Sequence, residues 1–364
     1  MKIAYIAETS LSNKSAYTLH VLKMCDAFSK QGEVQLILPH IKSNFKLNKI
    51  KKDFLLTPKK KFTVKGILKY KVKNFLNRIY FGYKSAKYIK KTNSNIVLTR
   101  SIIASFFLCI FKVKHFLEIH NELNGLTKFL MINLNFINSY YITNIILISK
   151  TLSKIFPKIK KNKTLILHDA VNIKNFKYRK DNNKIRNLTY IGSFYKGKGI
   201  ELILELAKYF KNLNFNIYGE PLKKIDNISG NVKIHGYINY KKVPNALAKS
   251  DILLLPSADL QFGRAKNINI TNYNSPLKMF DYLASGKIIL ASKRDGICEV
   301  LKHNYNSIIV NKYDLDNWII EINKIMNKKY NLIKLKKNSI KTAKRHTWDK
   351  RVDIILTNCV NSDI

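Results

Sequence analysis

Short apolar strands alternate with segments of helical period along almost the whole chain. Residues 2–7 alternate as a strand, residues 15–30 carry apolar side chains at helical spacing, and residues 34–38 form a second strand after Gly32. A strand, a crossover helix and a strand make one βαβ unit, and the right-handed connection makes the two strands parallel. The opening of the chain therefore predicts an α/β fold built on parallel sheets.

The alternation runs in two series, each of which predicts one doubly wound domain. The first series continues with a helix ending near residue 91, strands at 96–99, 115–119, 144–148 and 163–167, and helices at 102–111 and 126–141. The second series has strands at 188–191, 215–218, 232–235, 252–255 and 288–291, and helices at 200–210, 242–250, 315–327 and 348–359. We expect two Rossmann-like domains, residues 1–170 and 171–345, with ligand binding at the carboxyl ends of the strands.

The composition is that of a globular protein. The 364 residues are 46% hydrophobic and 11% aromatic, which is sufficient for sizeable buried cores. The four cysteines are scattered without a C-x-x-C pair, which indicates a reducing compartment rather than disulfides or a zinc site. The sequence shows no signal peptide and no apolar run of membrane-spanning length, so we expect a cytoplasmic protein.

The net charge is the extreme feature of the composition. The 66 Lys and Arg against 23 Asp and Glu give +43, and the densest run lies in residues 42–91. After residue 65 this run has apolar side chains at helical spacing, which is typical of a basic amphipathic helix on an anionic membrane surface. An ordinary solvated face explains the same charge equally well. No nucleic-acid module is visible. If the basic surface binds a partner, we expect that partner to be the inner face of the cell membrane.

Residues 274–292, NSPLKMFDYLASGKIILAS, predict a turn, a short amphipathic helix and a buried strand. Ser275 is the expected N-cap, and Pro276 is expected in the first helical turn. The apolar side chains share one face, whereas Lys278 and Asp281 are expected elsewhere on the helix. The free N–H groups and positive dipole end of such a helix make an anion site.

A glycine-rich loop, GSFYKGKG, follows the predicted strand at 188–191 and runs from Gly192 to Gly199. Its N–H groups and Lys198, at the start of the next helix, suit a diphosphate. Glycines at this spacing also occur in plain strand-to-helix corners, and the G-K-[ST] ending of a nucleoside-triphosphate P-loop is missing. Together with the helix start at Ser275, the loop predicts a bound diphosphate.

His120 follows the apolar strand at 115–119, in the segment FLEIHNE. A loop histidine without a role is the plain alternative, but the carboxyl end of a parallel strand favours a residue of a binding site. Glu118 and Glu122 flank His120 without the spacing of a metal site, and the chain has no H-E-x-x-H or G-x-S-x-G motif. We expect no bound metal, no cofactor and no serine-hydrolase triad.

The second half of the chain resembles the carboxyl-terminal domain of the retaining group 1 glycosyltransferases of family 4. The matching segments are YIGSFYKGKGIELILELA, FNIYGE, VKIHGY, SDILLLPS, SPLKMFDYLASGKIILAS and ICEVL. The first half matches in order through AYTLHVLKMCDAFSKQGEVQLILP, IVLTRS, FLEIHN, ILISKTL and LHDAVNIKNF. The resemblance covers nearly the whole chain except residues 42–91. It implies the GT-B fold, in which two Rossmann-like domains face each other across a cleft and the helix at 346–364, HTWDKRVDIIL, packs back on the first.

The resemblance also implies a role for each matched position. His120 would lie near the transferred sugar, Lys198 on the diphosphate and Asp281 on the ribose, and these three are the implied catalytic residues. Ser15 and Arg100 would lie on the acceptor side, in the first domain. The implied donor-binding residues are Gly192, Ser193, Gly236, Tyr237, Ser275, Pro276, Leu277, Lys278 and Glu299.

The implied reaction moves a sugar from a nucleotide-diphosphate donor to an acceptor, with retention of anomeric configuration and without a metal. A glycan or lipid-linked acceptor in cell-surface polysaccharide synthesis fits the basic first domain. The departing diphosphate gains negative charge, which Lys198 and the N–H groups of residues 275–278 would stabilise.

Three positions depart from the family pattern. Tyr273 stands where the first acidic residue of an E-x7-E pair is expected, Ser193 replaces an arginine, and residues 13–16 read NKSA in place of a Gly-Gly loop. The candidates to supply the missing charge are Lys196, Arg264 and Lys278. Two other functions stay open: a sugar-nucleotide epimerase or hydrolase of the same fold, and a non-catalytic basic protein that binds membranes or nucleic acid.

Overall fold

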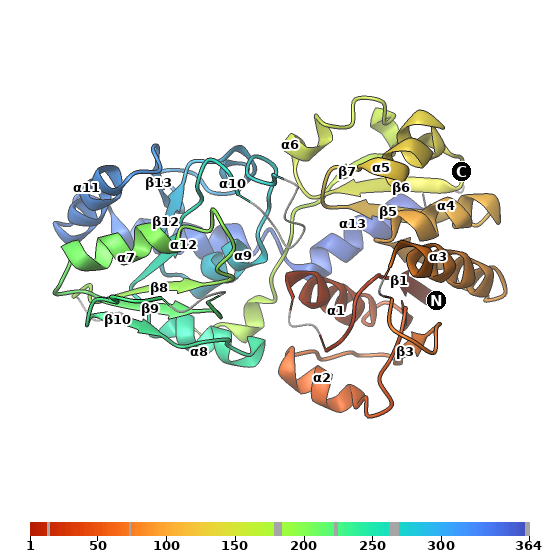
Figure 1. Ribbon diagram of the computed structural model, residues 1–364, viewed down its shortest axis with the longest axis horizontal. Helices are drawn as coiled ribbons and strands as arrows, with labels where there is room; N and C mark the ends of the chain where they lie inside the picture. The colour runs from red at the N-terminus through yellow and green to blue at the C-terminus, as the bar shows by residue number, and fades with distance from the viewer. Residues whose placement is uncertain (13–14, 73, 178–183, 222–224, 262–268, 361–364) are drawn as a thin grey trace. The chain divides into compact units, whose positions relative to one another are not determined.

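The computed structural model describes residues 1–12, 15–72, 74–177, 184–221, 225–261 and 269–360. The chain forms two compact units, each with its own sheet (Figure 1). Unit 1 comprises Met1–Ile148, Leu152–His168 and Trp348–Ile364, and unit 2 comprises Ser149–Thr151 and Asp169–Thr347. The segment that begins at Trp348 therefore returns to unit 1.

Unit 1 is built on a seven-stranded sheet with the order β3-β2-β1-β4-β5-β6-β7, in which every pairing is parallel. The order reverses between β1 and β4, which is the switch point of a doubly wound sheet. The strands are β1 (Lys2–Ile6), β2 (Glu33–Leu38), β3 (Phe62–Gly66), β4 (Ile96–Thr99), β5 (His115–Ile119), β6 (Ile142–Leu147) and β7 (Thr164–Ile166).

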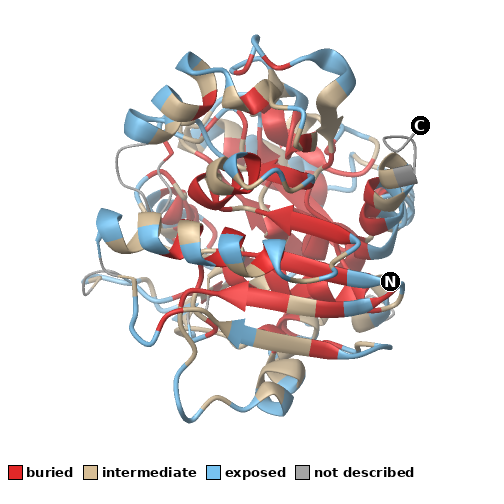
Figure 2. Ribbon diagram, turned by 90° about the vertical axis from the view of Figure 1, so that its right-hand side faces the viewer, coloured by how far each residue is buried: buried red, intermediate tan, exposed pale blue. Residues whose placement is uncertain are grey.

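Helices cover the sheet of unit 1, so the central strands are buried (Figure 2). Helix α1 (Ala16–Phe28) packs against α13 (Trp348–Val360), and α3 (Phe75–Lys90) packs against α4 (Ile102–Ile110). Right-handed crossovers put α1 on one face of the sheet and α3 and α4 on the other. The shorter helical segments are α2 (Leu47–Asp53), α5 (Gly125–Lys128), the π-helix η1 (Phe129–Asn133), the 3₁₀ helices η2 (Phe136–Asn138) and η3 (Lys161–Lys163), and α6 (Lys150–Ser153) at the change of units.

Unit 2 repeats this architecture with six parallel strands in the order β10-β9-β8-β11-β12-β13. Its strands are β8 (Asn187–Ile191), β9 (Asn214–Tyr218), β10 (Val232–Ile234), β11 (Ile252–Leu255), β12 (Ile288–Ser292) and β13 (Ile308–Val310). Its helices are α7 (Ile200–Tyr209), α8 (Val243–Ala248), α9 (Leu277–Ser285), α10 (Asp295–Cys298), α11 (Leu315–Met326) and α12 (Leu332–Ala343), with 3₁₀ turns η4 (Ile173–Asn175) and η5 (Tyr240–Lys242). The predicted α/β class with two doubly wound parallel sheets is confirmed.

The prediction for the basic segment is partly wrong. Residues 62–66 form strand β3, which pairs with β2 from Val34↔Phe62 to Leu38↔Gly66, and no amphipathic helix runs from residue 65. Ile67 and Leu68 pack on the core of unit 1, and helix α3 starts only at Phe75, where Asn74 caps it. In residues 62–66, backbone pairing with β2 at the sheet edge determines the conformation, in spite of the helical spacing of apolar residues that follows.

Two further predictions of elements are corrected. The single helix predicted at 126–141 is instead the series α5, η1 and η2, and Asn135 (φ 57°) separates the last two. Strand β13 and helix α12 were not predicted, because a three-residue strand and a lysine-rich helix give weak periodicity. The long loop expected at 259–273 lies partly outside the described residues.

Helix α9 differs from its prediction in two ways. Pro276 is the N-cap, with φ −74° and ψ 131°, so the helix begins at Leu277 and Ser275 does not cap it. Its polar face is also covered, because Asp281 and Ser285 are buried together with the apolar residues of the helix. Because α9 is short and buried on nearly all sides, its position in unit 2 is fixed by packing.

Candidate functional site

The glycine-rich loop of unit 2 follows β8, the strand at the switch point of its sheet. Gly197 (φ 82°) and Gly199 (φ 78°) adopt left-handed backbone conformations. A Cβ on Gly199 would lie 2.5 Å from Cβ of Pro256, which follows the neighbouring strand β11. The loop is thus packed tightly across the carboxyl ends of β8 and β11, and it leads directly into α7.

Two lysines converge on this loop without a counter-ion. Burial lowers the pKa of Lys198 to about 8, and burial together with the positive charge of Lys198 lowers the pKa of Lys278 well below its usual range. Within the described parts of the chain, neither ammonium group has a hydrogen-bond or ion-pair partner. Burial and mutual repulsion disfavour the charged forms of the two lysines, so an anion bound between them would stabilise both charges.

Gly192 fixes where Lys278 lies. The Nζ of Lys278 sits 3.8 Å from the ring centroid of Tyr190, whose hydroxyl donates a hydrogen bond to the carbonyl of Ser193 (2.8 Å). A Cβ on Gly192 would lie 2.7 Å from Nζ of Lys278 and 2.8 Å from Oη of Tyr190. The absence of a side chain at position 192 therefore leaves the room that the ammonium group occupies.

The start of helix α9 adds uncapped polar groups. No side chain caps it in the described residues, so the first N–H groups depend on water or a ligand. Ser275, next to the N-cap Pro276, is buried, and its Oγ has no hydrogen-bond partner in the described part of the chain. Leu277 is buried beneath this end of the helix. The arrangement suits an anion at the positive end of the helix dipole.

Asp281 lies one turn further along α9 and is buried. Its Oδ1 accepts a hydrogen bond from the hydroxyl of Tyr240 at 3.0 Å, and burial followed by the charge of Asp281 raises the pKa of Tyr240. Lys278 precedes Asp281 by three residues, so the two side chains are neighbours on the helix. Tyr240 was not predicted as part of the site, because no sequence signal links it to Asp281.

Three glycines lie at the carboxyl ends of neighbouring strands. Gly219 donates its N–H to the carbonyl of Gly236 (2.8 Å), and a Cβ on Gly219 would lie 2.0 Å from the carbonyl oxygen of Gly192. Gly236 (φ 68°) has open space on its Cβ side, and the half-buried Tyr237 follows it. The structure thus brings predicted residues Gly192, Ser193, Gly236 and Tyr237 to one edge of the sheet of unit 2.

Glu299, by contrast, serves the backbone of another segment. Its carboxylate accepts hydrogen bonds from the N–H groups of Lys150 and Thr151 (2.8 Å each) and from the hydroxyl of Thr151 (2.7 Å). Tyr273, in the place of the expected acidic residue, is buried, and its carbonyl accepts a hydrogen bond from Ser149. Of the candidates for the missing charge, Lys278 lies at the glycine loop, Lys196 is exposed and Arg264 lies outside the described residues.

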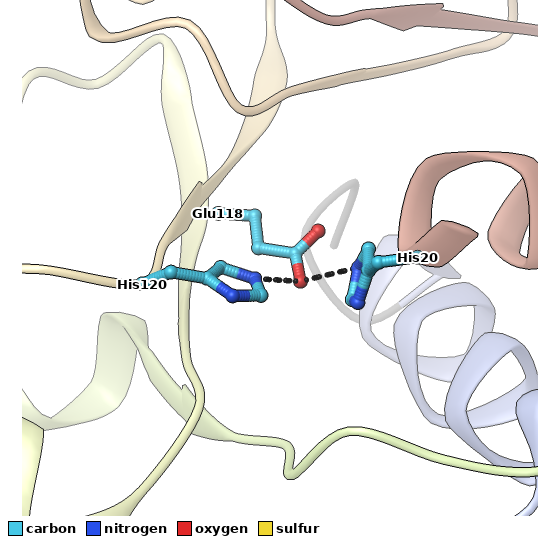
Figure 3. A group of neighbouring side chains, drawn as sticks. All are labelled: His20, Glu118 and His120. Carbon is cyan, nitrogen blue, oxygen red and sulfur yellow. Dashed lines mark hydrogen bonds and ion pairs between the residues drawn. The ribbon is translucent and has the colours of Figure 1, made fainter. Parts of the chain in front are cut away.

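In unit 1, His120 belongs to a buried ionic network around Glu118. The Glu118 Oε1 atom lies 2.8 Å from Nε2 of His120, 2.9 Å from Nε2 of His20 and 2.5 Å from Nη2 of Arg351. Its Oε2 atom accepts a hydrogen bond from Tyr5 at 3.1 Å. Figure 3 shows the two histidine rings on either side of the carboxylate.

The network is held by strands and helices that are distant in sequence. Glu118 and His120 are two residues apart at the end of β5, so their side chains project to the same side. The spacing in the sequence could have predicted this contact. His20 comes from α1, and Arg351 from α13, where it also donates hydrogen bonds to the carbonyls of Leu167 and His168. No local sequence pattern indicates that His20 and Arg351 contact Glu118, so neither residue was predicted as part of the site.

The three side chains His20, Glu118 and His120 offer ligand atoms within 4.8 Å of one another. A cation would share Glu118 Oε1 with the Arg351 guanidinium, and Tyr5 already donates to Oε2. The fixed positive charge of Arg351 disfavours a divalent ion at this carboxylate. The donor set therefore fits an ion-paired network better than a metal site.

The two residues predicted on the acceptor side have different roles in unit 1. Arg100, after β4, stacks on Tyr17 with its Cζ 4.1 Å from the ring centroid, and its buried Nη1 has no partner among the described residues. Ser15 is the N-cap of α1, and its Oγ accepts a hydrogen bond from the N–H of Thr18 at 3.2 Å. Arg100 has a donor to offer, whereas Ser15 is engaged by its helix.

The comparison with protein families addresses unit 2. Residues 172–346 match the family described as glycosyl transferases group 1. This segment is similar to a group 1 glycosyltransferase domain. The matched segment contains the lysine pair, the glycine loop and helix α9.

Relatives extend the likeness beyond the group 1 domain. An uncharacterized glycosyltransferase of Methanocaldococcus jannaschii is 22% identical over 215 residues, which are 57% of this chain and 56% of the relative. The chain spans about half the length of the curated relatives it matches.

Solved structures share the fold of both units. Anabaena Alr3699/HepE, solved with UDP and glucose, has a TM-score of 0.69 at 13% identity and covers 98% of this chain and 99% of its own. The lipopolysaccharide outer core galactosyltransferase WaaB, in its apo form, has a TM-score of 0.68 at 15% identity and full coverage of both chains. At these identities the likeness shows the fold, which is that of the GT-B glycosyltransferases.

Proposed function

We propose that the protein transfers a sugar from a nucleoside-diphosphate donor to an acceptor hydroxyl. The observation that carries the proposal is the pair Lys198 and Lys278, two desolvated ammonium groups without a counter-ion beside Gly192 and near the start of α9. A diphosphate supplies the negative charge that this arrangement lacks. UDP or UDP-sugar complexes of proteins with this fold support the same donor class.

The chemistry follows from where charge develops. As the bond between the anomeric carbon and the diphosphate breaks, the electron pair leaves with the diphosphate oxygen. Lys198, Lys278 and the N–H groups at the start of α9 would stabilise that charge, and the loss of one such donor typically costs about a hundredfold in rate. The cations come from the chain itself, which supports transfer without a metal ion.

The remaining details of the proposal rest on family resemblance. The resemblance supports retention of anomeric configuration, Asp281 at the ribose, Gly236 and Tyr237 beside the base, and His120 near the sugar. A glycan or lipid-linked acceptor is proposed for unit 1, where Arg100 has an unpartnered buried nitrogen. Assembly of a cell-surface polysaccharide is the proposed setting, with the protein in the cytoplasm.

A binding panel followed by a transfer assay tests this function. We expect one nucleoside diphosphate to raise the melting temperature in the presence of EDTA, and Lys198→Met and Lys278→Met to abolish the shift. Lys211→Met, an exposed lysine of unit 2, is the matched control. Product formed with no acceptor present would favour an epimerase or hydrolase, and a panel without any stabilising nucleotide would contradict the proposal.

We also propose that unit 1 associates with an anionic membrane surface. Between Asp53 and Glu118 the chain has thirteen lysines and two arginines but no acidic residue. Helix α3 in this stretch exposes Phe75, Leu76 and Tyr80. Exposed apolar side chains among uncompensated cations are typical of a peripheral membrane surface. None of the described helices has both the length and the apolar character of a membrane span.

A further inference from the structure

The orientation of His120 is determined by its contact with Glu118. Nε2 of His120 lies 2.8 Å from the carboxylate, so this nitrogen carries the proton whenever Glu118 is ionised. Burial and the charge of Arg100 lower the pKa of His120, and the contact with Glu118 raises it. The lowering effects dominate, and the pKa is about 3. At neutral pH the ring is then uncharged, and Nδ1 is its hydrogen-bond acceptor.

Glu118 is kept ionised in spite of its burial. Burial alone would raise the pKa of this carboxyl, but His20, Arg351 and His120 together bring its pKa well below the usual range. Arg351 is the only one of these three partners with a permanent charge. Its guanidinium is itself fixed by the carbonyls of Leu167 and His168.

His120 is the one member of the network that reaches solvent. Its side chain is 14% exposed, whereas those of Glu118 and Arg351 are 0% and 3% exposed. His20 and Tyr5 are also buried. Any influence of the network on a bound sugar therefore passes through the His120 ring.

We propose that Arg351 and Glu118 are positioning residues that hold His120 as its Nε2–H tautomer and present Nδ1 as the acceptor for a hydroxyl of a bound sugar. The role of His120 at a sugar rests on the transfer function proposed above, whereas its tautomer is a property of the free protein. A tautomer set by a buried carboxylate has a large effect on rate wherever the outward nitrogen accepts a proton or a hydrogen bond.

Removal of Arg351 makes the network sensitive to pH. In Arg351→Met the buried Glu118 loses its permanent counter-charge, so its pKa rises toward that of a desolvated carboxyl. Once protonated, Glu118 donates to Nε2 of His120, and the ring proton moves to Nδ1. The groups that still face Glu118 and His120 are Tyr5 from β1, His20 from α1 and Arg100 after β4.

Two readouts test the proposal. Histidine ¹⁵N chemical shifts, assigned with His120→Gln, should report the Nε2–H tautomer in the wild type from about pH 6 to about pH 9. Arg351→Met should show Nδ1–H at low pH and recover Nε2–H as the pH rises. In the transfer assay kcat of this variant should be about a hundredfold lower at neutral pH and rise with pH, while the donor KM changes little.

Further variants separate charge from packing. Arg351→Lys keeps the cation and should restore both the tautomer and the flat pH profile. Asp349→Asn removes the exposed ion pair between α13 and Lys30, which follows α1, and should leave both readouts unchanged. If Arg351→Met does not fold, the nearly isosteric Glu118→Gln should give a mixed tautomer that does not change with pH.

Three results would overturn the proposal: an Nδ1–H wild type, an unchanged tautomer in Arg351→Met or in Glu118→Gln, or equal losses in the Lys and Met variants. The tautomer is measured without substrate. A protein that transfers no sugar would therefore contradict the proposed function and still decide whether Arg351 and Glu118 position the ring.

Discussion

At the scale of single residues, Gly192 determines the geometry of the candidate donor site. Its missing side chain leaves space for Nζ of Lys278, and Tyr190 lies on the far side of that space. The glycine was predicted from the loop pattern, and so was the anion site. The sequence could not show why position 192 must be a glycine. The ammonium group of Lys278, from α9, lies where a Cβ of residue 192 would be, and these two residues are 86 positions apart in the chain.

Gly192→Ala tests this geometry. The new methyl group meets both the flexible end of Lys278 and the buried Oη of Tyr190, so it should displace Lys278 and lower the free energy of unfolding by about 1–3 kcal/mol. Affinity for the nucleoside diphosphate should fall about tenfold or more, because a desolvated charge-assisted contact is lost. Gly230→Ala is the control, because its Cβ would meet no atom within 4 Å. Calorimetric binding equal to that of the wild type would refute the role of Gly192.

The titration of Lys198 predicts that donor binding takes up protons. In the free protein the pKa of Lys198 is about 8, and a bound diphosphate raises it toward or above the ordinary lysine value. Affinity should be highest below about pH 8 and decrease by up to about tenfold per pH unit above it. Isothermal titration in buffers of different ionisation enthalpy measures the uptake. Lys198→Met should remove its share, and an uptake that this variant retains in full would contradict the assignment.

At the scale of elements, local chemistry explains which segments were predictable. Strands β1, β4 and β11 are apolar runs bounded by polar residues, and they formed where expected, as did β5, which contains the buried polar residues His115 and Glu118. Strand β3 was missed because its pairing with β2 is a non-local interaction, and residues 129–133 were missed because a π-helix has no distinct sequence pattern. The burial of the polar residues of α9 was not predicted, because α12, a helix that was itself not predicted, packs on α9.

Ser15 gives a prediction for helix α1. Because its Oγ caps the first turn, Ser15→Ala should lower the free energy of unfolding by about 1 kcal/mol. Affinity for the nucleotide should not change, since the cap lies in unit 1. Ser12→Ala, at an exposed position of the same loop, is the matched control. A variant with unaltered stability in urea but impaired acceptor use would instead support direct contact with the acceptor.

At the scale of the whole molecule, the sequence indicated two sheets and two units, because the alternation of strands and helices restarts at β8. The sequence also located the basic run, but it could not show which apolar side chains in that run are exposed. The exposure of Phe75 and Leu76 on α3 comes from the structure.

The charge of +43 predicts salt-dependent membrane binding. The protein should sediment with vesicles that contain phosphatidylglycerol and not with phosphatidylcholine alone, and added salt should weaken binding because it screens exposed charge. Phe75→Ser with Leu76→Ser should weaken binding about tenfold. Exposed Ile333→Ser in unit 2 is the control. Stronger binding to duplex DNA than to anionic vesicles would contradict the membrane proposal.

The contact between Glu118 and Arg351 joins residues 233 positions apart. During synthesis at typical elongation rates, Arg351 is added roughly 10–50 s after Glu118. Until Arg351 is made, Glu118 lacks its one permanently charged partner, so we expect the ionic network of unit 1 to be completed only when the last helix has been synthesised. Unit 1 therefore cannot be completed until the last helix, α13, has been synthesised.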